Sequence, residues 1–443
     1  MQHHFLSSTA SAGGHYGAVN PMGHAAMRTS NMGLVLRHLY DSGPRSRATL
    51  AAEVGLSKAT ISTLVGELSA RGLVTEGEAD RQGRVGRPGI EVAVDGSAVC
   101  GIGVEITVEY IAVAIVDLAG QVRASHSVPM PTPEQDSAVQ IPGTPPASES
   151  RAGFVPSDPA HALDHVAAQV TRALDIAADE GLWPAGILVA PPGIIDYASG
   201  VVRFAPNLGW RNVPLLHELR ARLGVGAPPI GLENDAKLSA VAAYAEMGRD
   251  EVQDLVYLTG DVGVGAGIIS GGRLVRGWSG FSGEVGHVTV VDGGEQCPCG
   301  RRGCWELYVG LGALLAALPE DAPANDPHLP MPERLANVRE FLEAENPGVL
   351  AAFESIGAQL ARGAGLLVDV LNPRAMVLGG YLGYFADVFQ EPLAAALEAR
   401  LIDEGSAVEV MQGPRGLEAA AVGGALVVLD SVLTDPTLVP LAR

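Results

Sequence analysis

Three of the four cysteines in this chain lie within the segment CPCGRRGC. Cys297, Cys299 and Cys304 are spaced as C-x-C-x4-C, and His287 lies upstream in the segment GEVGH. Three thiolates and one imidazole complete the tetrahedral shell that Zn²⁺ prefers, and a zinc ion with four protein ligands is structural rather than catalytic. Reduced thiols or a disulfide are the alternatives, although Cys297 and Cys299 are too close in sequence for an unstrained bridge. We therefore predict a structural zinc site.

A second candidate functional segment lies between Arg47 and Arg71. Apolar residues recur there at helical spacing on both sides of Gly55, which predicts two crossed helices joined by a tight turn. Ser57 is placed to cap the second helix. A plain helical hairpin with a polar outer face is the alternative. The outer side chains suit base edges and phosphates in a DNA major groove, and they are Ser57, Lys58, Thr60, Ser62 and Thr63.

The segment that follows, GLVTEGEADRQGRVGRPGIEVAV, is typical of a strand, a turn and a second strand, as in a wing. Arg84 and Arg87 stand among the glycines of its tip, and such segments enter the narrow minor groove of DNA. An arginine-rich surface loop is the alternative for this segment taken alone. With a first helix near residues 32–42, we predict a winged-helix unit over residues 28–95, preceded by a disordered tail over residues 1–27.

The charge distribution agrees with a small DNA-facing unit on an acidic body. The net charge is −21, yet nine lysines and arginines stand against seven acidic residues from Arg28 to Glu91. An ordinary fluctuation of surface charge is the alternative. No apolar run approaches the roughly 18 residues that span a bilayer, and the first 27 residues hold no lysine or arginine, unlike a signal peptide. We expect a cytoplasmic protein with no membrane partner.

From Val99 onward, short runs rich in valine and isoleucine alternate with helical stretches, such as residues 160–181 and 234–247. This alternation predicts an α/β body. Cys100 falls in the first of these runs and is predicted to be a small buried apolar side chain. Residues 129–159 are rich in proline, serine and threonine, which predicts a flexible surface insertion.

Several segments of this body resemble the ROK family of repressors, open reading frames and sugar kinases. They are GILVAPPG, PNLGW, END, TGDVGVGAGIISGG, GEVGH, CPCGRRGCWE and VLGGYL. The resemblance extends from Arg28 onward, because ROK repressors also carry a winged helix. It implies a two-lobed, actin-like ATPase fold of the ribonuclease H type. Lobe 1 is expected over residues 96–228 and lobe 2 over residues 229–424, with residues 425–443 packing back on lobe 1.

The resemblance also implies which residues bind a sugar between the lobes. Sugar hydroxyls both donate and accept hydrogen bonds, so carboxylates and amides bind them well. The positions that match the family's motifs are Asn207, Asn234, Asp235, Glu284, His287 and Glu306. His287 is in the metal set too, and it would turn one ring nitrogen to zinc and the other to a hydroxyl. For Asn207 taken alone, capping a turn is the favoured interpretation.

Asp235 occupies the position at which the family's kinases hold their general base. Those kinases also carry Asp-x-Gly-Gly-Thr, whose glycines let backbone N–H groups approach the phosphates of ATP. Here Glu105 replaces the aspartate, and Thr107, Val108 and Glu109 occupy the turn, where Glu109 is expected to repel phosphates. We therefore predict that the protein is not an enzyme.

The sequence as a whole predicts a sugar-responsive repressor of carbohydrate genes. Its partners are expected to be double-stranded operator DNA, a small sugar or sugar derivative, and a second copy of the chain in a homodimer, with a tetramer left open. One alternative is a ROK kinase that phosphorylates a hexose or an amino sugar with ATP, using Asp235 as general base. Another is a DNA-binding regulator that has lost its sugar.

Overall fold

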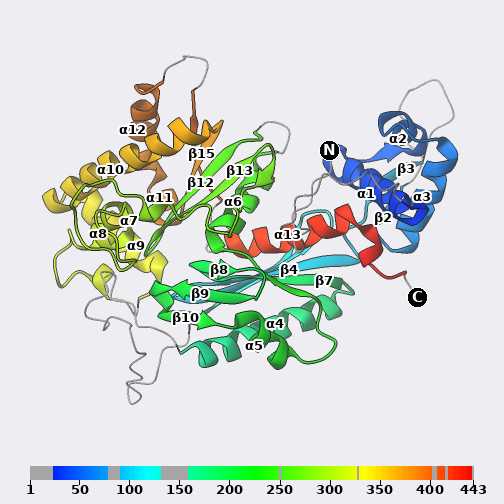
Figure 1. Cartoon of the computed structure of the whole chain (residues 1–443), viewed down its shortest axis with the longest axis horizontal. Coiled ribbons are helices and arrows are strands. Elements are labelled where there is room, and N and C mark those ends of the chain that lie inside the picture. Colours follow the sequence, from blue (N-terminus) through cyan, green and yellow to red (C-terminus); the bar gives the residue numbers. More distant parts are fainter. Residues whose placement is uncertain are drawn as a thin grey trace.

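The structure, a computed structural model, describes residues 23–77, 90–130, 158–248, 252–326, 329–401, 407–414 and 418–441. Figure 1 shows a winged-helix unit at one end of the molecule and two α/β lobes beside it. The predicted fold class is confirmed, because the winged-helix unit precedes two lobes that each carry helices on a five-stranded sheet.

The winged-helix unit contains three helices and a small sheet of order β1-β3-β2. Its elements are α1 (His24–Ser42), β1 (Arg45–Ser46), α2 (Arg47–Glu53), α3 (Lys58–Ala70), β2 (Val74–Glu76) and β3 (Glu91–Val94). Gly55 adopts the left-handed conformation, with a φ of 72°, which lets the chain turn sharply between α2 and α3. The hydroxyl of Ser57 accepts a hydrogen bond from Thr60 N at 3.1 Å, so the predicted cap is confirmed.

Helix α1 begins at His24, eight residues before the predicted start at residue 32. The last four residues of the predicted tail, 24–27, are therefore helical, while residues 1–22 lie outside the described part of the chain. Strands β2 and β3 pair antiparallel as the wing requires. Residues 78–89 between them, with Arg84 and Arg87, are outside the described residues, as are residues 131–157 of the predicted insertion.

The two lobes are built on sheets with the same order of strands. Each sheet is an antiparallel meander of three strands, extended beside its first strand by two parallel strands. The strands of lobe 1 are β4 (Val99–Ile106), β5 (Tyr110–Asp117), β6 (Val122–Pro129), β7 (Trp183–Ala190) and β11 (Ile230–Leu232). The strands of lobe 2 are β12 (Leu255–Gly260), β13 (Val264–Ser270), β14 (Arg273–Leu274), β15 (Ala375–Gly379) and β16 (Glu409–Gln412).

Helices cover the outer faces of both sheets. Lobe 1 carries α4 (Pro159–Asp179), α5 (Leu215–Leu223) and a small sheet of β8 (Ile194–Asp196), β9 (Val201–Ala205) and β10 (Trp210–Val213). Lobe 2 carries α7 (Glu306–Val309), α8 (Leu311–Leu315), α9 (Met331–Glu343), α10 (Pro347–Leu371), α11 (Gly380–Tyr384) and α12 (Ala386–Glu398). Cys100 on β4 is fully buried under this layer, as predicted.

Two helices, α6 (Asp235–Glu246) and α13 (Ala419–Thr434), pack against each other between the sheets. Glycines make this approach close: a Cβ on Gly103 of β4 would lie 1.7 Å from the carbonyl oxygen of Ala421. A Cβ on Gly423 of α13 would lie 1.9 Å from the carbonyl oxygen of Leu238 on α6. Strand β11 belongs to the sheet of lobe 1, although it follows the predicted lobe boundary at residue 228. Helix α13 begins six residues before the C-terminal segment predicted over residues 425–443.

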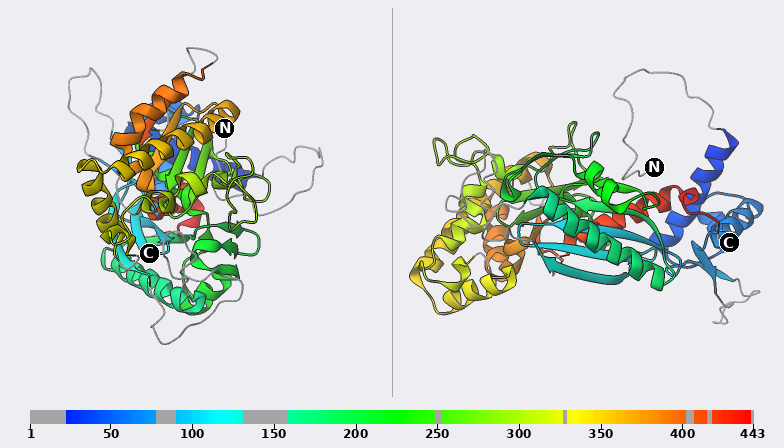
Figure 2. Two further views of the ribbon diagram at one scale, coloured as in Figure 1. Left: turned by 90° about the vertical axis from the view of Figure 1, so that its left-hand side faces the viewer. Right: turned by 90° about the horizontal axis from the view of Figure 1, so that it is seen from below.

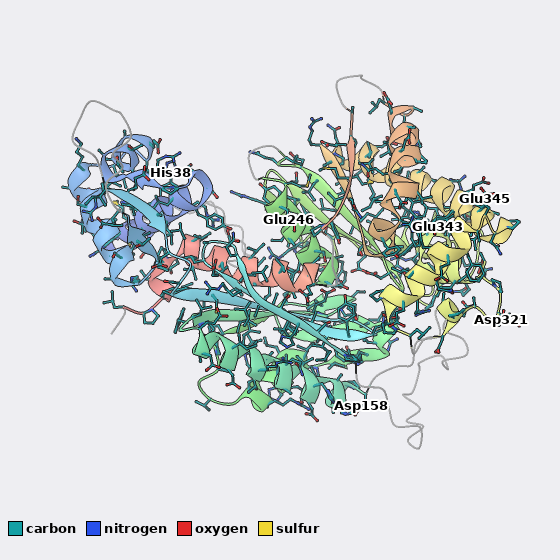
Figure 3. The ribbon with its side chains drawn as sticks, turned by 180° about the vertical axis from the view of Figure 1, so that it is seen from behind. His38, Asp158, Glu246, Asp321, Glu343 and Glu345 are labelled. Carbon is teal, nitrogen blue, oxygen red and sulfur yellow. The ribbon has the colours of Figure 1, made fainter. Side chains whose placement is uncertain are left out.

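The winged-helix unit is docked on the far end of α13 (Figures 1 and 2). Arg37 of α1 donates to the Asp430 carboxylate at 2.5 Å, and a Cβ on Gly33 would lie 2.4 Å from the Thr434 carbonyl oxygen. Arg71 donates to the carbonyl oxygen of Val439. Figure 3 shows the molecule from behind, with His38 labelled in the winged-helix unit and Glu246 labelled at the end of α6.

Buried apolar side chains form one continuous cluster from the winged-helix unit to both lobes. The cluster includes Leu36 of α1, Leu429 of α13, Leu238 of α6 and Leu188 of β7. Helix α13 contacts both α6 and α1, so it connects the helix at the pocket with the winged-helix unit. In the described part of the chain, no helix is long and apolar enough to cross a membrane.

Candidate functional site

A pocket opens between the lobes, at the N-terminal end of α6. All six residues predicted to bind a sugar line it: Asn207, Asn234, Asp235, Glu284, His287 and Glu306. Gly263 makes room where the lobes meet, because a Cβ there would lie 3.2 Å from Glu306 Oε2 and 3.5 Å from Asn207 Nδ2. The structure thus brings together side chains from four separate segments of the sequence.

Asn234 and Asp235 are fixed by the start of α6. The side-chain oxygen of Asn234 caps the helix by accepting from Lys237 N at 3.2 Å. Its amide nitrogen donates to Asp235 Oδ1 at 2.9 Å, and Ala236 N donates to the same oxygen at 2.8 Å. Burial, together with the nearby carboxylates of Asp261 and Glu284, raises the pKa of Asp235 to about 7.

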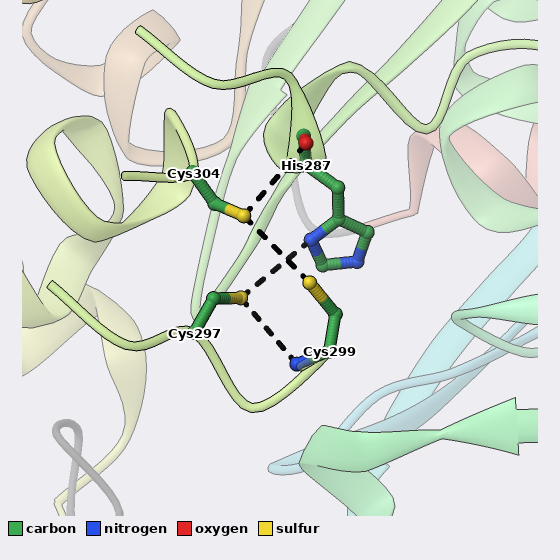
Figure 4. A group of neighbouring side chains, drawn as sticks. All are labelled: His287, Cys297, Cys299 and Cys304. Carbon is green, nitrogen blue, oxygen red and sulfur yellow. Dashed lines mark hydrogen bonds between the residues drawn. The ribbon is translucent and has the colours of Figure 1, made fainter. Parts of the chain in front are cut away.

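The predicted metal ligands gather beside this pocket (Figure 4). One ligand atom from each of His287, Cys297, Cys299 and Cys304 lies within 4.8 Å of the others. The Cys299 and Cys304 sulfurs are 3.6 Å apart, and Cys297 Sγ is 3.8 Å from His287 Nδ1. A tetrahedral zinc ion with Zn–S bonds of about 2.3 Å needs sulfurs about 3.8 Å apart, so the donor set fits a metal ion of this kind.

His287 connects the metal cluster to the pocket. Its Nδ1 atom faces Cys297 and lies 3.1 Å from Glu306 Oε1, while its other ring nitrogen points away from the three sulfurs (Figure 4). The thiol of Cys297 also lies 3.0 Å from that Glu306 oxygen. A metal ion held here would take Nδ1 and the three sulfurs as ligands and would so fix the ring of His287, while the contacts of Glu306 to Nδ1 and to the Cys297 thiol belong to the cluster without the ion.

A buried polar network behind the pocket was not predicted from the sequence. Glu233 is 2% exposed; it accepts from Arg276 Nε at 2.6 Å, from Tyr197 OH at 2.5 Å and from Asn234 N at 3.1 Å. Lys237, 1% exposed, donates to Tyr197 OH and to the carbonyl oxygen of Gly280. The network ties α6 to the loop before Glu284. The signal available in the sequence was Lys237, a lysine within the mostly apolar stretch that forms α6.

The turn between β4 and β5, over residues 107–109, is closed by its own contacts. The hydroxyl of Thr107 accepts from the backbone N–H groups of Glu109 and Tyr110 at 3.2 and 3.0 Å. Glu109 is not the free repelling charge that the sequence suggested. Its carboxylate pairs with Arg334 of α9 at 3.2 Å and accepts from Met331 N at 3.1 Å, which ties lobe 1 to lobe 2.

The residues predicted to contact DNA differ in how free their side chains are. Lys58 and Ser62 are exposed on the outer face of α3. Ser57 and Thr60 are engaged with each other, since their hydroxyl oxygens lie 2.8 Å apart at the helix start. Thr63 donates to the Ala59 carbonyl oxygen at 3.1 Å.

Two family models match the chain. The model of the ROK family matches residues 151–431, and the model of the MarR family matches residues 33–84. The xylose repressor of Bacillus spizizenii is 27% identical over 410 residues, which span 91% of this chain and 96% of that protein. The glucokinase of Streptomyces coelicolor is 29% identical over 342 residues, which span 73% of this chain and 96% of that protein.

Among solved structures too, a regulator matches almost the whole chain and a kinase matches about three quarters of it. A ROK family transcriptional regulator, described as a homologue of the E. coli MLC protein, superposes with a TM-score of 0.70 at 20% identity. The match covers 93% of this chain and 98% of that one. A ROK family glucokinase from Streptomyces griseus in complex with glucose and AMPPNP gives a TM-score of 0.55 at 25% identity, covering 74% and 98%. The regulators therefore match along the winged-helix unit as well as the lobes.

Proposed function

The chain belongs to the ROK family, and on that basis we propose that it is a sugar-responsive transcriptional repressor. The observation that carries the proposal is the path from pocket to DNA-binding unit. Helix α6 begins in the pocket at Asp235 and packs on α13, which holds α1 of the winged-helix unit through Asp430 and Arg37. A ligand that moves α6 therefore moves the unit that binds DNA.

In this proposal the sugar lies between the lobes. Asn207, Asn234, Asp235, Glu284, His287 and Glu306 bind its hydroxyls. A zinc ion held by His287 and the three cysteines would supply no chemistry; it would fix the ring of His287 so that the other ring nitrogen faces the sugar. Sugar binding lowers operator affinity through a coupling of ~1–3 kcal/mol, a factor of about 5 to 150.

We propose that a homodimer binds the operator. Two winged-helix units then contact half-sites about one helical turn apart, or a multiple of one turn, with α3 of each in a major groove. Lys58 and Ser62 are exposed on that face of α3, as are Ser57 and Thr63, and in this proposal the wing arginines Arg84 and Arg87 extend the contact to the minor groove.

Kinase activity is the less favoured function, although the family includes glucokinases. A turn that binds the phosphates of ATP needs glycines that let backbone N–H groups approach, yet Thr107, Val108 and Glu109 form the turn that lines the pocket, and Asp261 adds a further carboxylate to the lining. Asp235 in this proposal serves as a hydrogen-bond acceptor for a sugar hydroxyl rather than as a general base.

The test is a panel of pentoses, hexoses and amino sugars applied to the protein on DNA from upstream of its own gene and the neighbouring genes. We expect at least one sugar to release the operator and to raise the unfolding temperature, without sugar-dependent consumption of ATP. Turnover of ATP that Asp235→Asn abolishes would favour the kinase. If no sugar raised the unfolding temperature, the regulator would not be a sugar sensor.

Lys58→Ala is expected to weaken binding to all DNA sequences and to lower the salt dependence of binding by about one unit of log–log slope, since one phosphate contact is lost.

Arg84→Ala combined with Arg87→Ala is expected to weaken operator binding while sugar affinity stays the same. Titrations by fluorescence anisotropy measure both effects. Arg172→Ala, on an exposed arginine of α4, removes the same charge as a control. Unchanged operator affinity in the arginine double variant would rule out the wing.

A further inference from the structure

An ion pair joins lobe 1 directly to lobe 2 at the pocket. Glu109 lies on the turn between β4 and β5 of lobe 1, and Arg334 lies in the first turn of α9 in lobe 2. Glu109 Oε1 accepts from Arg334 Nη1 at 3.2 Å, and Glu109 Oε2 accepts from Met331 N, at the start of α9, at 3.1 Å. Both oxygens of one lobe 1 carboxylate are therefore bound by the first turn of a lobe 2 helix.

Both partners of this inter-lobe pair, Glu109 and Arg334, are fixed within their own lobes. The Arg334 side chain is 0% exposed, and its Nε atom donates to the carbonyl oxygen of Ala324 in lobe 2 at 2.8 Å. The Glu109 side chain is 11% exposed, and its backbone is held by the hydroxyl of Thr107 and by Met130 N, which donates to Glu109 O at 2.7 Å. Loss of one partner from such a buried pair costs far more than from an exposed pair.

The inter-lobe pair also belongs to the wall of the pocket. Glu109 and Met331 both line it, together with Asp235 at the start of α6. A donor and an acceptor more than about 3.5 Å apart no longer form a hydrogen bond, so an opening of the lobes by about 1 Å at this point breaks both contacts of the carboxylate. The pair therefore depends on the distance between the two lobes.

The inter-lobe pair is suited to be made and broken. Burial raises the pKa of Glu109, and the charge of Arg334 offsets that effect only in part. In a buried ion pair the cost of removing both charges from water nearly cancels their attraction. When the lobes separate, water regains access to both groups, so the pair opens at a small net cost.

We propose that the inter-lobe pair holds the two lobes closed around the pocket and sets the fraction of the protein that is closed before a sugar arrives. This inference rests on the proposed function: the closed form binds the sugar, and the open form binds the operator. A larger closed fraction raises the apparent affinity for the sugar and lowers the apparent affinity for the operator.

The test uses two substitutions of Glu109 in the full chain. Glu109→Gln keeps the size of the side chain and an acceptor for Met331 N but removes the charge that pairs with Arg334. Glu109→Asp keeps the charge but shortens the side chain by one methylene, so the carboxylate no longer reaches α9. Both variants are expected to place more of the protein in the open form.

The sugars used as probes are D-xylose, D-glucose and N-acetylglucosamine, with calorimetry for sugar binding and fluorescence anisotropy for operator binding. In both variants the sugar affinity is expected to fall about 10-fold or more. Operator affinity without sugar is expected to be equal to or higher than that of the unmodified protein. A variant that merely loosened the fold would weaken both kinds of binding, so the opposite directions distinguish the two cases.

Small-angle X-ray scattering measures the opening of the lobes itself. Without sugar, the radius of gyration of Glu109→Gln is expected to exceed that of the unmodified protein, and a saturating sugar is expected to restore it. Glu218→Gln is the matched control, because it breaks a pair with Arg222 that lies within α5 of lobe 1. The control is expected to leave the sugar affinity, the operator affinity and the radius of gyration unchanged.

Three results would overturn the inference and leave the repressor intact. The first is an unchanged sugar affinity in both variants, and the second is a lower operator affinity without sugar. The third is a lower sugar affinity with an unchanged radius of gyration, which would mean that Glu109 acts on the sugar directly. If none of the sugars in the wider panel bound the unmodified protein, the proposed function itself would fail, and the scattering of the variant without sugar would still test the inter-lobe pair.

Discussion

Replacing Cys299 by serine is expected to release the metal ion and to weaken sugar binding by about 10- to 100-fold. Cys299 contributes one of the four ligand atoms of the cluster, and its sulfur faces Cys304 at 3.6 Å. Without the metal, the contacts of the His287 ring among the described residues are those to Glu306 and to the Cys297 thiol, and Glu306 is itself proposed to bind the sugar. The weakened sugar affinity therefore comes from misplaced hydrogen-bonding groups, not from a lost contact to the ligand.

Elemental analysis of the purified variant measures the metal, and calorimetry measures the sugar. Operator binding without sugar is expected to be unchanged, because the winged-helix unit packs on α13 and not on the cysteine cluster. Cys100→Ala is the matched control, since Cys100 is a buried thiol on β4 outside the cluster. A variant that has lost its metal and still responds normally to the sugar would show that the cluster does not support the pocket.

Replacing Arg37 by alanine is expected to separate sugar binding from operator release. Arg37 donates to the carboxylate of Asp430, which is 3% exposed, and removal of one partner leaves a buried charge unpaired at a cost of about 3–5 kcal/mol. The winged-helix unit is then held less firmly on α13. The affinity for the sugar is expected to stay within a factor of about two of that of the unmodified protein. The ratio of operator affinity without sugar to operator affinity with sugar is expected to fall toward 1.

The double variant Arg37→Met with Asp430→Leu tests whether the charge or the contact matters. Two apolar side chains of similar volume in place of a buried ion pair are often neutral or stabilising, so docking and the sugar response are expected to return. Arg400→Ala breaks an exposed ion pair with Asp369, 44% and 49% exposed, and is expected to have no measurable effect. If Arg37→Ala kept its full sugar response, the path through α13 would be wrong.

Local signals allowed much of the molecule to be predicted. The turn at Gly55 and the cap at Ser57 lie within one short segment, and both are observed as expected. The cysteine motif is also local, because its spacing alone brings three sulfurs together. The α/β alternation indicated an α/β body, and the family resemblance implied its two lobes. The helix limits were predicted only approximately: α1 starts at His24 and α13 at Ala419.

What the sequence could not supply is the pairing of residues far apart in the chain. Glu109 and Arg334 are separated by 225 positions, so Glu109 could be interpreted only as an uncompensated charge. The partners of Glu233 come from a loop 43 residues later and from a turn 36 residues earlier. Family motifs indicated the pocket residues themselves, because those positions match by sequence, but not the network that holds them.

Arg37 and Asp430 are 393 positions apart, and this separation has a consequence for synthesis. Ribosomes add about 5 to 20 residues per second, and the N-terminal part folds first. The winged-helix unit therefore emerges from the ribosome roughly 20 to 80 s before α13, the helix on which it docks, has been synthesised. During that interval the winged-helix unit exists without the completed lobes. The response to sugar is therefore the last property that a newly made chain acquires.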